Sequence, residues 1–468
     1  MNAPLPRPSP ASLQKLRDAL GPRLPEGVLR DDPELLETYG GDESGAAPHL
    51  PDLLARPTTT EEVSLILAAA SAARVPVTPR GGGTGRAGGA IPLAGGLVLS
   101  LERMKGIIAL DPASLTVRVR PGMILGELHA AVEAERLFYP PDPNSLESCH
   151  LGGNVATNAG GPRAGKYGVT RDHVLGVEAV LADGTILRVG RQTLKGVAGY
   201  DLTGLLVGSE GTLAVITEVT LRLRPLPTRV ETALCFFPDV HAAARGVLAI
   251  QRAGHVPRAL ELMDAAAIDA VRGKTAFPFP EGDAAALLLE LDGHGEAVFE
   301  ELGVVAELAS EAGAHEVLVA RSLSQKNELW GARRILSPSL REAHAHKIAE
   351  DIAVPLAAIP ACIEGIHAIA AREGLACAVY GHAGDGNLHA NLLWDDPGKG
   401  EAVDRAVVAL FELAVGLGGT ITGEHGIGLT KRDYLPLEQS PALIALQRRL
   451  KDTFDPAGIL NPGKIFSL

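Results

Sequence analysis

The glycine-rich stretch PRGGGTGRAGGA, residues 79–90, restricts the possible folds of this chain more than any other segment. Gly83, Gly85 and Gly88 satisfy the spacing G-x-G-x-x-G, but in dinucleotide-binding folds that motif leads directly into a helix that receives the pyrophosphate. The residues that follow, IPLAGG, contain a proline and two glycines, which oppose a helix. We therefore reject a nicotinamide-binding fold. The stretch is either an anion-binding nest of backbone amides beside Arg80 or a surface loop without a ligand.

Two further glycine segments follow, CHLGGNVATNAGGPRAGKYG at residues 149–168 and YDLTGLLVGSEGTLAVITEVTL at residues 200–221. Both combine glycines, which allow a ligand to approach the backbone closely, with short polar side chains. Residues 56–101 around the first loop read as a capped helix followed by short strands. Three such segments within one unit of helices and strands favour a large cofactor that carries phosphate over three loops without a ligand.

In this order, the three segments resemble the FAD-binding domain of the vanillyl-alcohol oxidase and p-cresol methylhydroxylase superfamily. The resemblance implies FAD, and we expect non-covalent FAD because residues 79–90 contain no histidine for flavin attachment, although Cys149 and His150 precede the second segment. It implies that the first segment lies at the pyrophosphate, the second along the flavin, and the third at the adenosine side or the ring system. The residues implied to bind FAD are Pro79, Arg80, Gly81, Gly82, Gly83, Thr84, Gly85, Gly152, Gly153, Asn154, Thr157, Asn158, Gly160, Gly161, Glu210, Gly211, Ile216 and Asn461.

The length of 468 residues predicts more than one domain, and the texture changes beyond Pro225 and Pro227, where apolar helical periods alternate with strands. With the resemblance, the predicted fold class is α+β. It consists of a two-part FAD-binding domain of the vanillyl-alcohol oxidase type, a substrate (cap) domain with an antiparallel sheet, and a C-terminal segment that returns to the FAD domain. The predicted bounds are 1–45 for an N-terminal helical lead segment, 46–228 for the FAD-binding domain, 229–440 for the cap domain that binds substrate and metal, and 441–468 for the C-terminal segment.

A hairpin is predicted in ACAVYGHAGDGNLHANLLW, residues 376–394, with its turn at residues 384–386. The return strand alternates, so Asn387, His389 and Asn391 share one face. His382 ends the first strand and can lie beside His389, which lets two imidazoles hold a divalent metal. Two solvated histidines without a metal are the alternative.

A second histidine motif, GGTITGEHGIGLTKRDYL at residues 418–435, places Glu424 and His425 between glycines. Together the two motifs resemble the C-terminal domain of FAD-linked 2-hydroxy-acid dehydrogenases, a family that includes D-lactate, glycolate and D-2-hydroxyglutarate dehydrogenases. The resemblance implies that His382, His389 and Glu424 bind a divalent metal, that Asn391 lies beside them at the substrate, and that His425 is the catalytic base. Zinc suits two histidines and a carboxylate, and manganese or iron is the alternative.

The carboxylate of a hydroxy acid is best held by a guanidinium or an ammonium group. The segment NELWGARRILSPSL at residues 327–340 offers Arg333 and Arg334. The resemblance points to Arg333, three residues after the tryptophan, as the substrate anchor, with Ser337 as a second contact and Lys347 as a further catalytic-site lysine. Surface salt bridges are the alternative for each cation.

The predicted reaction is oxidation of a small D-2-hydroxy acid, D-lactate first, to the 2-oxo acid by hydride transfer to flavin N5. The metal polarises the substrate hydroxyl, and neutral His425, with an ordinary imidazole pKa of about 6.5, accepts its proton. A glycolate oxidase FAD subunit and a D-2-hydroxyglutarate dehydrogenase are alternatives within the family. Outside it, a metal-dependent hydrolase, a non-catalytic flavin subunit and the ether-lipid branch of the superfamily stay open.

Charge and cysteine content limit the partners. With 43 basic and 56 acidic residues the formal charge is −13, which disfavours nucleic acid. The four cysteines form no C-x-x-C pair and are poorly spaced for an iron–sulfur cluster, so the electron acceptor is expected to be external: a quinone, a cytochrome or an electron-transfer partner. The proline-rich start lacks an apolar signal core, which predicts a cytoplasmic protein that can attach peripherally to a membrane through a partner. A homodimer and a complex with a partner subunit both stay open.

Overall fold

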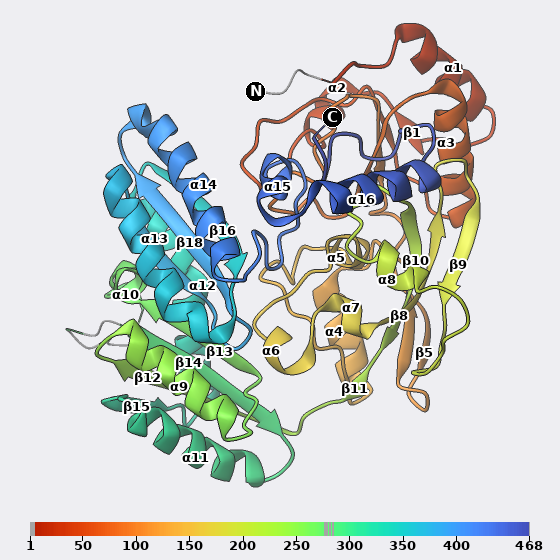
Figure 1. Ribbon diagram of the computed structural model, residues 1–468. Coiled ribbons are helices and arrows are strands. Elements are labelled where there is room, and N and C mark those ends of the chain that lie inside the picture. Colours follow the sequence, from red (N-terminus) through yellow and green to blue (C-terminus); the bar gives the residue numbers. More distant parts are fainter. Residues whose placement is uncertain (1–4, 276–278, 280–281, 283–284, 468) are drawn as a thin grey trace. The chain divides into compact units, whose positions relative to one another are not determined.

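The structure, a computed structural model, describes residues 5–275, 279, 282 and 285–467 (Figure 1). The first four residues of the predicted lead segment, a few residues of the predicted cap domain and the last residue lie outside this part. The chain forms two compact units: unit 1 comprises Met1–Ala159, Val169–Leu226 and Glu424–Leu468, and unit 2 comprises Gly160–Gly168 and Pro227–Gly423. Unit 1 thus contains the predicted lead and C-terminal segments and most of the predicted FAD-binding domain, together with residues 424–440, which the sequence analysis assigned to the cap domain.

The first sheet of unit 1 has four strands in the order β1-β2-β4-β3, and β4 runs parallel to both β2 and β3. These strands are β1 (Leu29–Arg30), β2 (Leu53–Ala55), β3 (Val77–Arg80) and β4 (Leu97–Ser100). Their neighbours in the chain are α1 (Pro10–Leu20), α2 (Pro33–Glu37) and α3 (Thr60–Ala73). Helix α3 begins where the sequence predicts, because the Thr59 hydroxyl accepts a hydrogen bond from the Glu62 amide at 3.2 Å. Helices α1 and α3 share one hydrophobic core with this sheet.

The second sheet of unit 1 is antiparallel, with five strands in the order β5-β6-β10-β8-β9. Its strands are β5 (Ile107–Asp111), β6 (Thr116–Val119), β8 (Val174–Val180), β9 (Ile186–Gly190) and β10 (Val215–Arg222). The remaining elements of this part are β7 (Leu137–Phe138), which pairs with β11 (Arg224–Pro225), α4 (Leu125–Ala134), α5 (Leu151–Thr157), α7 (Thr170–His173) and α8 (Leu202–Leu206). This sheet and helices α4 and α5 bury a second hydrophobic core.

The C-terminal segment returns to the first sheet of unit 1, as predicted. After η3 (Arg432–Tyr434), α15 (Leu435–Glu438) and α16 (Pro441–Phe454), the chain runs beside β3. The Val77 amide donates to the carbonyl of Ile459 at 2.8 Å, and the Asn461 amide donates to the carbonyl of Val77 at 2.7 Å. The segment therefore lies against the strand that leads into the first glycine loop.

Unit 2 is built on an antiparallel sheet of seven strands in the order β15-β12-β14-β13-β17-β18-β16. The strands are β12 (Arg229–Phe237), β13 (Ala259–Asp264), β14 (Ala285–Gly293), β15 (Glu316–Val319), β16 (His346–Ala353), β17 (Ala376–His382) and β18 (Asn387–Trp394). The helices are α6 (Ala164–Tyr167), α9 (Val240–Arg252), α10 (Ala265–Val271), α11 (Ala297–Glu311), α12 (Leu323–Ala343), η1 (Leu356–Ala358), α13 (Ile359–Glu373), η2 (Pro397–Lys399) and α14 (Gly400–Gly416).

Helices cover both faces of this sheet (Figure 1). Helices α10 and α12 pack on the face that carries Met263 and Tyr380, and form one hydrophobic cluster with it. Helices α9 and α13 lie on the opposite face, where Gly246 of α9 meets the Phe237 ring and His367 of α13 meets Cys377. The predicted antiparallel sheet thus has helices packed on both faces. Successive side chains along one strand contact the helices of opposite faces in turn.

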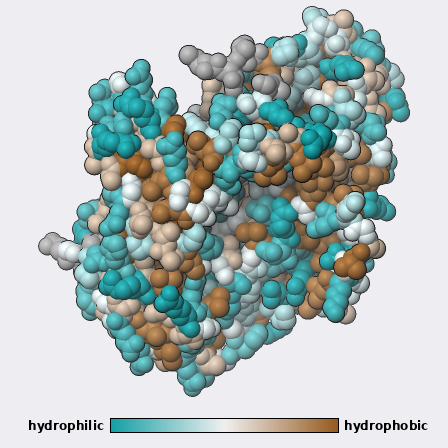
Figure 2. Space-filling model, in the orientation of Figure 1, coloured by the Kyte–Doolittle hydropathy of each residue, from teal (hydrophilic) through white to brown (hydrophobic). Residues whose placement is uncertain are grey.

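Within the part of the chain that the structure describes, no helix combines the length and apolarity that crossing a bilayer requires. Hydrophilic and hydrophobic side chains are interspersed over the face that Figure 2 shows. Scattered apolar side chains of this kind are ordinary on protein surfaces.

Candidate metal and substrate site

The predicted hairpin is present as strands β17 and β18, joined by residues 383–386. Tyr380 pairs with His389 and Ala378 pairs with Asn391, so these side chains point to the same face of the sheet. Leu388 and Ala390 on the other face are fully buried. The predicted alternation is therefore confirmed. His382 is also buried, which disagrees with the alternative of two solvated histidines.

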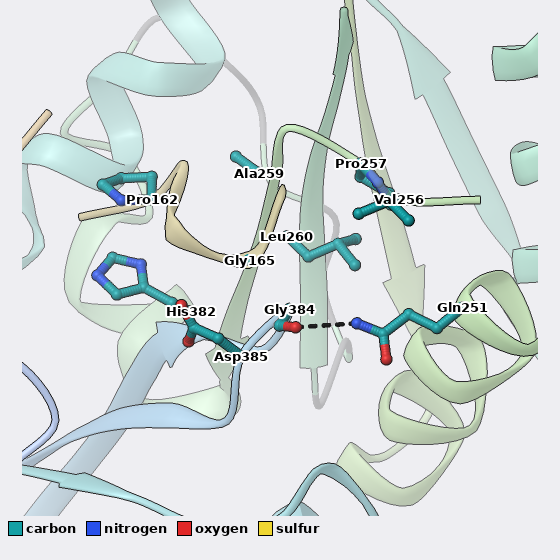
Figure 3. A pocket seen from close by; sticks show the side chains of 10 residues that line it. All are labelled: Pro162, Gly165, Gln251, Val256, Pro257, Ala259, Leu260, His382, Gly384 and Asp385. Carbon is teal, nitrogen blue, oxygen red and sulfur yellow. Dashed lines mark hydrogen bonds between the residues drawn. The ribbon is translucent and has the colours of Figure 1, made fainter. Parts of the chain in front are cut away.

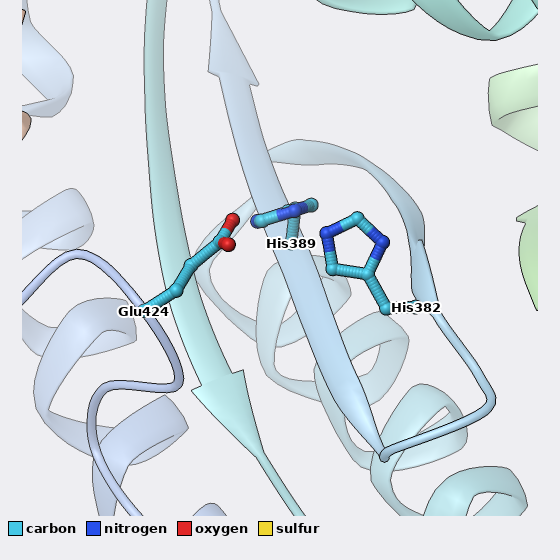
Figure 4. A group of neighbouring side chains, drawn as sticks. All are labelled: His382, His389 and Glu424. Atoms are coloured by element: carbon cyan, nitrogen blue, oxygen red, sulfur yellow. The ribbon is translucent and has the colours of Figure 1, made fainter. Parts of the chain in front are cut away.

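His382, His389 and Glu424 come together at one point (Figure 4). One ligand atom from each residue lies within 4.8 Å of the others, and the two imidazole rings are 5.4 Å apart between centroids. Figure 4 shows the Glu424 carboxylate directed at the His389 ring, with the His382 ring beyond it. Two imidazoles and one carboxylate form a donor set that suits zinc, manganese or iron, and leaves coordination positions for a substrate.

A buried carboxylate, Asp351 of β16, fixes the segment that leads into Glu424. It accepts hydrogen bonds from the Thr422 hydroxyl at 2.9 Å and the Gly423 amide at 3.0 Å. Its other oxygen accepts from the side-chain amide of Asn387 at 2.6 Å. Because Glu424 follows Gly423 directly, its place beside the hairpin is set by this short stretch of chain.

A second buried carboxylate, Glu261 of β13, joins the metal and substrate parts of the site. Its Oε1 accepts from Nδ1 of His382 at 2.5 Å, and its Oε2 accepts from Nε of Arg333 at 2.7 Å. Burial alone would raise the pKa of Glu261, but the charges and hydrogen bonds of His382 and Arg333 outweigh burial and lower this pKa to about 2. With Nδ1 engaged, Nε2 is the ring nitrogen of His382 that can bind an ion.

The predicted substrate anchors lie on helix α12 and the neighbouring strand β16. The Arg333 guanidinium lies over the Tyr380 ring at 4.6 Å. Apart from the bond to Glu261, it forms no hydrogen bond among the described residues, so its two Nη groups can receive a carboxylate. Ser337 lies one turn further along the helix, and Nζ of Lys347 donates to its hydroxyl at 2.6 Å. The structure therefore places Arg333 and Ser337, on helix α12, and Lys347, on strand β16, at the face of the sheet that also carries His382 and His389.

Asn391 is the remaining predicted residue of this group, and it is fully buried. Its side-chain NH₂ donates to the carbonyls of Ala378 at 3.1 Å and His389 at 3.0 Å. Its side-chain oxygen has no hydrogen-bond partner in the described part of the chain. A buried acceptor without a donor is costly, and a bound ion, water or hydroxyl group would remove that cost. This observation and the donor set together fit a bound divalent ion.

A small hollow adjoins His382 on unit 2 (Figure 3). On one side the carbonyl of Gly384 accepts a hydrogen bond from Gln251 at 2.9 Å. The lining residues are Pro162, Gly165, Gln251, Val256, Pro257, Ala259, Leu260, His382, Gly384 and Asp385. The lining combines apolar side chains with Gln251, His382 and Asp385, and no lysine or arginine is among these residues.

The parts of the three glycine segments that belong to unit 1 meet one another. A Cβ on Gly82 would lie 2.6 Å from the carbonyl oxygen of Ser148, and one on Gly211, where φ is +68°, would lie 3.1 Å from Pro79. By contrast, a Cβ on Gly85 or Gly153 would meet no atom of the described residues within 4 Å. The first two glycines allow the segments to pack, whereas the other two leave backbone open to a ligand. This cradle fits a bound FAD.

The other predicted FAD contacts are distributed as follows. Residues Gly152 to Thr157 form helix α5, Asn158 ends it in a left-handed conformation, and Gly160 and Gly161 belong to unit 2. Ile216 of β10 is buried in the hydrophobic core. Pro79 and Arg80 end β3, and Gly81 to Gly85 follow in the loop. The glycines therefore lie where their backbone can line a cofactor, whereas the Ile216 side chain packs in the hydrophobic core.

Asn461 and His150 border this cradle and carry buried atoms without partners. The Asn461 side chain donates to the carbonyls of Gly89 at 3.0 Å and Glu210 at 2.8 Å. Its side-chain oxygen, and Nδ1 of His150, find no hydrogen-bond partner among the described residues. A polar cofactor at the glycine segments would supply such partners.

Glu210 makes contacts that the sequence does not predict. Its carboxylate accepts from the amides of Ile427 and Gly428, both at 2.8 Å, and so binds the loop that follows His425. Burial raises the pKa of Glu210 to about 6, although these two amides and the charge of Lys464 oppose that rise. A Cβ on Gly426 would lie 2.9 Å from this carboxylate, which explains the glycine after His425.

We expect Gly82→Ala to lower the FAD content of the purified protein. The added Cβ would press on the Ser148 carbonyl at 2.6 Å, and because this neighbour is backbone the two segments must separate. The ratio of flavin to protein absorbance measures the loss. Gly303→Ala is the control, because Gly303 lies on helix α11 outside the glycine segments and a Cβ there meets nothing within 4 Å among the described residues. Equal FAD content in wild type and Gly82→Ala would contradict the cradle.

Sequence reasoning did not identify three residues of the site: Glu261, Asp351 and Tyr380. Glu261 lies between leucines in the apolar strand ALELMD, and Asp351 lies in the strand HKIAEDIA. An acidic side chain inside an apolar strand is rarely buried without a partner, and that is the signal which could have found both carboxylates. Tyr380 gives no such signal, because its ring fits an ordinary core strand.

Two protein families match different parts of the chain. Residues 51–190 match the family described as FAD binding domain, and residues 226–465 match the family described as FAD linked oxidases, C-terminal domain. Glycolate oxidase subunit GlcD of Bacillus subtilis is 41% identical over 431 residues, which cover 92% of this chain and 92% of that protein. D-lactate dehydrogenase of Anaerostipes hadrus is 35% identical over 469 residues, which cover 98% of this chain and 97% of that protein.

Among solved structures, p-cresol methylhydroxylase with bound substrate superimposes with a TM-score of 0.80. The superposition covers 97% of this chain and 96% of that chain at 17% sequence identity. At this identity the likeness concerns the fold alone, and it agrees with the predicted α+β architecture.

Proposed function

Because the chain belongs to the family of FAD-linked oxidases, we propose that it oxidises a small D-2-hydroxy acid, D-lactate first among them, to the corresponding 2-oxo acid. The observation that carries the proposal is the chain of contacts in unit 2 that joins His382 through Glu261 to Arg333. It connects a metal-type donor set with a guanidinium whose Nη groups can bind a carboxylate. A 2-hydroxy acid offers a hydroxyl and a carboxylate on adjacent carbons, which are the two groups that such a pair of sites binds.

In this proposal, Arg333 binds the substrate carboxylate, and Ser337 with Lys347 adds a second polar contact. A divalent ion held by His382, His389 and Glu424 would supply Lewis acidity that makes the substrate hydroxyl more acidic. Neutral His425 accepts the hydroxyl proton, and the Asn391 oxygen is placed to accept a hydrogen bond. FAD, when bound by unit 1, supplies the acceptor for the hydride that leaves the substrate carbon. The Glu261 carboxylate holds the His382 ring and the Arg333 side chain in fixed orientation.

The relatives named D-lactate dehydrogenase and glycolate oxidase subunit support an acid with a short, uncharged side chain. A second substrate carboxylate, as in 2-hydroxyglutarate, would need a further cation beside the one that Arg333 offers to the first carboxylate. Glycolate, which lacks the methyl group of D-lactate, is the closest alternative, and the relative named glycolate oxidase subunit supports it.

A substrate panel with an artificial dye acceptor tests this proposal. We expect kcat/KM to be highest for D-lactate, with glycolate lower and D-2-hydroxyglutarate lowest, and L-lactate to be turned over poorly. Highest kcat/KM for glycolate would select the glycolate oxidase alternative. A colourless protein without flavin absorbance, or a flavoprotein that reduces no dye with any of these acids, would overturn the proposal and leave the hydrolase or the non-catalytic subunit.

We further propose that the electrons pass to an external quinone, cytochrome or electron-transfer partner. The relative named as a subunit of glycolate oxidase supports a complex with a partner subunit. Turnover of the isolated protein with a dye, compared with turnover after addition of a quinone analogue, separates an enzyme that works alone from one that needs its partner.

We expect Arg333→Lys to lower kcat/KM by about 10- to 100-fold, mainly through a higher KM, because hydrogen bonds to charged groups contribute about 1.5–3 kcal/mol. Lysine cannot reach Glu261 and a carboxylate in the same fork geometry. The matched control is Arg334→Lys, because Arg334 is exposed on the same helix and donates only weakly, to the Asn327 carbonyl at 3.4 Å. Steady-state kinetics with D-lactate measures both constants. A wild-type KM in Arg333→Lys would contradict the proposal that Arg333 binds the substrate carboxylate.

A further inference from the structure

A cysteine, a histidine and an aspartate form a second polar cluster in unit 2. Sγ of Cys377 lies 3.0 Å from Nδ1 of His367, and Nε2 of His367 lies 2.8 Å from the Asp264 carboxylate. The three side chains come from strand β17, helix α13 and the end of strand β13. Such an order of sulfur, imidazole and carboxylate is the arrangement in which an imidazole activates a cysteine and a third group orients the imidazole.

This cluster is separate from the candidate metal site. Cys377 and His382 are five positions apart on β17, so their side chains point to opposite faces of the sheet. Cys377 contacts α13 on one face, whereas Tyr380 belongs to the cluster with α10 and α12 on the other. Chemistry at Cys377 therefore does not require the metal ligands.

The Asp264 carboxylate is held rigidly. Its Oδ1 caps helix α10 by accepting from the Ala267 amide at 2.8 Å, and its Oδ2 accepts from the Val379 amide, also at 2.8 Å. The residue is buried, so its orientation toward His367 is set by backbone. The hydrogen bonds to Asp264 and then to Cys377 raise the pKa of His367 to about 10. At neutral pH the imidazole is thus a cation that donates one N–H to the carboxylate and the other to the sulfur.

The other three cysteines provide an internal comparison. Cys149, Cys235 and Cys362 are buried, whereas Cys377 is partly exposed. Burial raises the thiol pKa of all three, to about 12 for Cys235 and Cys362. Thiolates, rather than thiols, attack electrophiles, so these three are expected to be inert.

We propose that Cys377 is a nucleophilic thiol and a site of covalent modification by small electrophiles. The His367 side chain is 43% exposed, so a small reagent can approach this cluster from solvent. With iodoacetamide as the probe, Sγ attacks the carbon that bears iodine. The S–C bond forms, the C–I bond breaks, iodide leaves and the thiol proton passes to solvent. The reaction needs no oxidant or reductant.

The test is a time course of iodoacetamide labelling on the folded full-length flavoprotein at neutral pH, followed by denaturation, labelling of the remaining thiols with heavy iodoacetamide, and peptide mass spectrometry. We expect Cys377 to react faster than free glutathione and at least about 10-fold faster than the three buried cysteines. His367→Gln should lower the rate at Cys377 by about 10-fold or more, because the cation beside the sulfur is lost.

His241→Gln is the matched control, because His241 is an exposed histidine that contacts a carboxylate, Glu364, at 2.6 Å. In His241→Gln, the rate of labelling at Cys377 should equal the wild-type rate. A wild-type rate at Cys377 in folded His367→Gln would overturn the proposal. If that variant does not fold, the wild-type rate decides, because labelling of Cys377 more slowly than free glutathione would also overturn it. Labelling does not depend on turnover, so its outcome is independent of the proposed dehydrogenase activity.

Discussion

His425→Ala is expected to bind FAD and metal as wild type does but to oxidise D-lactate about 10²- to 10⁴-fold more slowly, the usual contribution of a general base. The hydroxyl proton of the substrate would lose its acceptor, while the donor set of His382, His389 and Glu424 would stay intact. The loss should fall on kcat more than on KM, because Arg333, the proposed anchor of the substrate carboxylate, is unchanged. Dye-linked kinetics, flavin absorbance and metal analysis measure the three properties on one sample.

Added imidazole separates a lost base from a damaged loop. The loop after His425 is held by Glu210 through the amides of Ile427 and Gly428, contacts that the alanine variant keeps. A free imidazole can then enter the vacated space and restore part of the activity. The control is His346→Ala, because His346 stacks on Trp394 away from the proposed chemistry. Turnover of His425→Ala at the wild-type rate would remove His425 from the mechanism.

Those parts of the fold that depend on local pattern could be predicted from the sequence. The alternation around His389 gave the faces of the hairpin correctly, because the side-chain period of a strand is two. The proline and glycines after residue 90 correctly excluded a helix there, because no helix forms between β3 and β4. The resemblance of the glycine and histidine motifs extended these local results to the FAD-linked oxidase fold.

Contacts between distant parts of the chain could not be predicted in the same way. Glu261 meets His382 across 121 positions, and Glu210 meets Ile427 across 217 positions. The chain has 56 acidic residues, and nothing in their local pattern indicates which of them pairs with which histidine or amide. Such pairings arise from strand order, since β13 becomes the neighbour of β17 only when the sheet has formed. For the same reason the resemblance proposed Arg333 as an anchor, but nothing in the sequence indicated the carboxylate that holds it.

Removal of the metal is expected to lower turnover of D-lactate by about 10³-fold or more, because loss of Lewis acidity costs several kcal/mol of transition-state stabilisation. Dialysis against a chelator should abolish activity while flavin absorbance stays unchanged, since the residues predicted to bind FAD include none of His382, His389 and Glu424. Readdition of zinc, manganese or iron(II), each alone, should restore activity with the native ion. Metal content measured beside kcat identifies that ion.

His389→Ala provides the genetic form of the same experiment. The variant loses one of three ligands, so its metal content after purification should fall, and chelator should then have little further effect on its residual turnover. The control is His241→Ala, an exposed histidine on helix α9 outside the donor set. Wild-type turnover after complete removal of metal would mean that His382, His389 and Glu424 act without an ion. Acidification of the substrate hydroxyl would then have to come from His425 and the buried polar groups of the site alone.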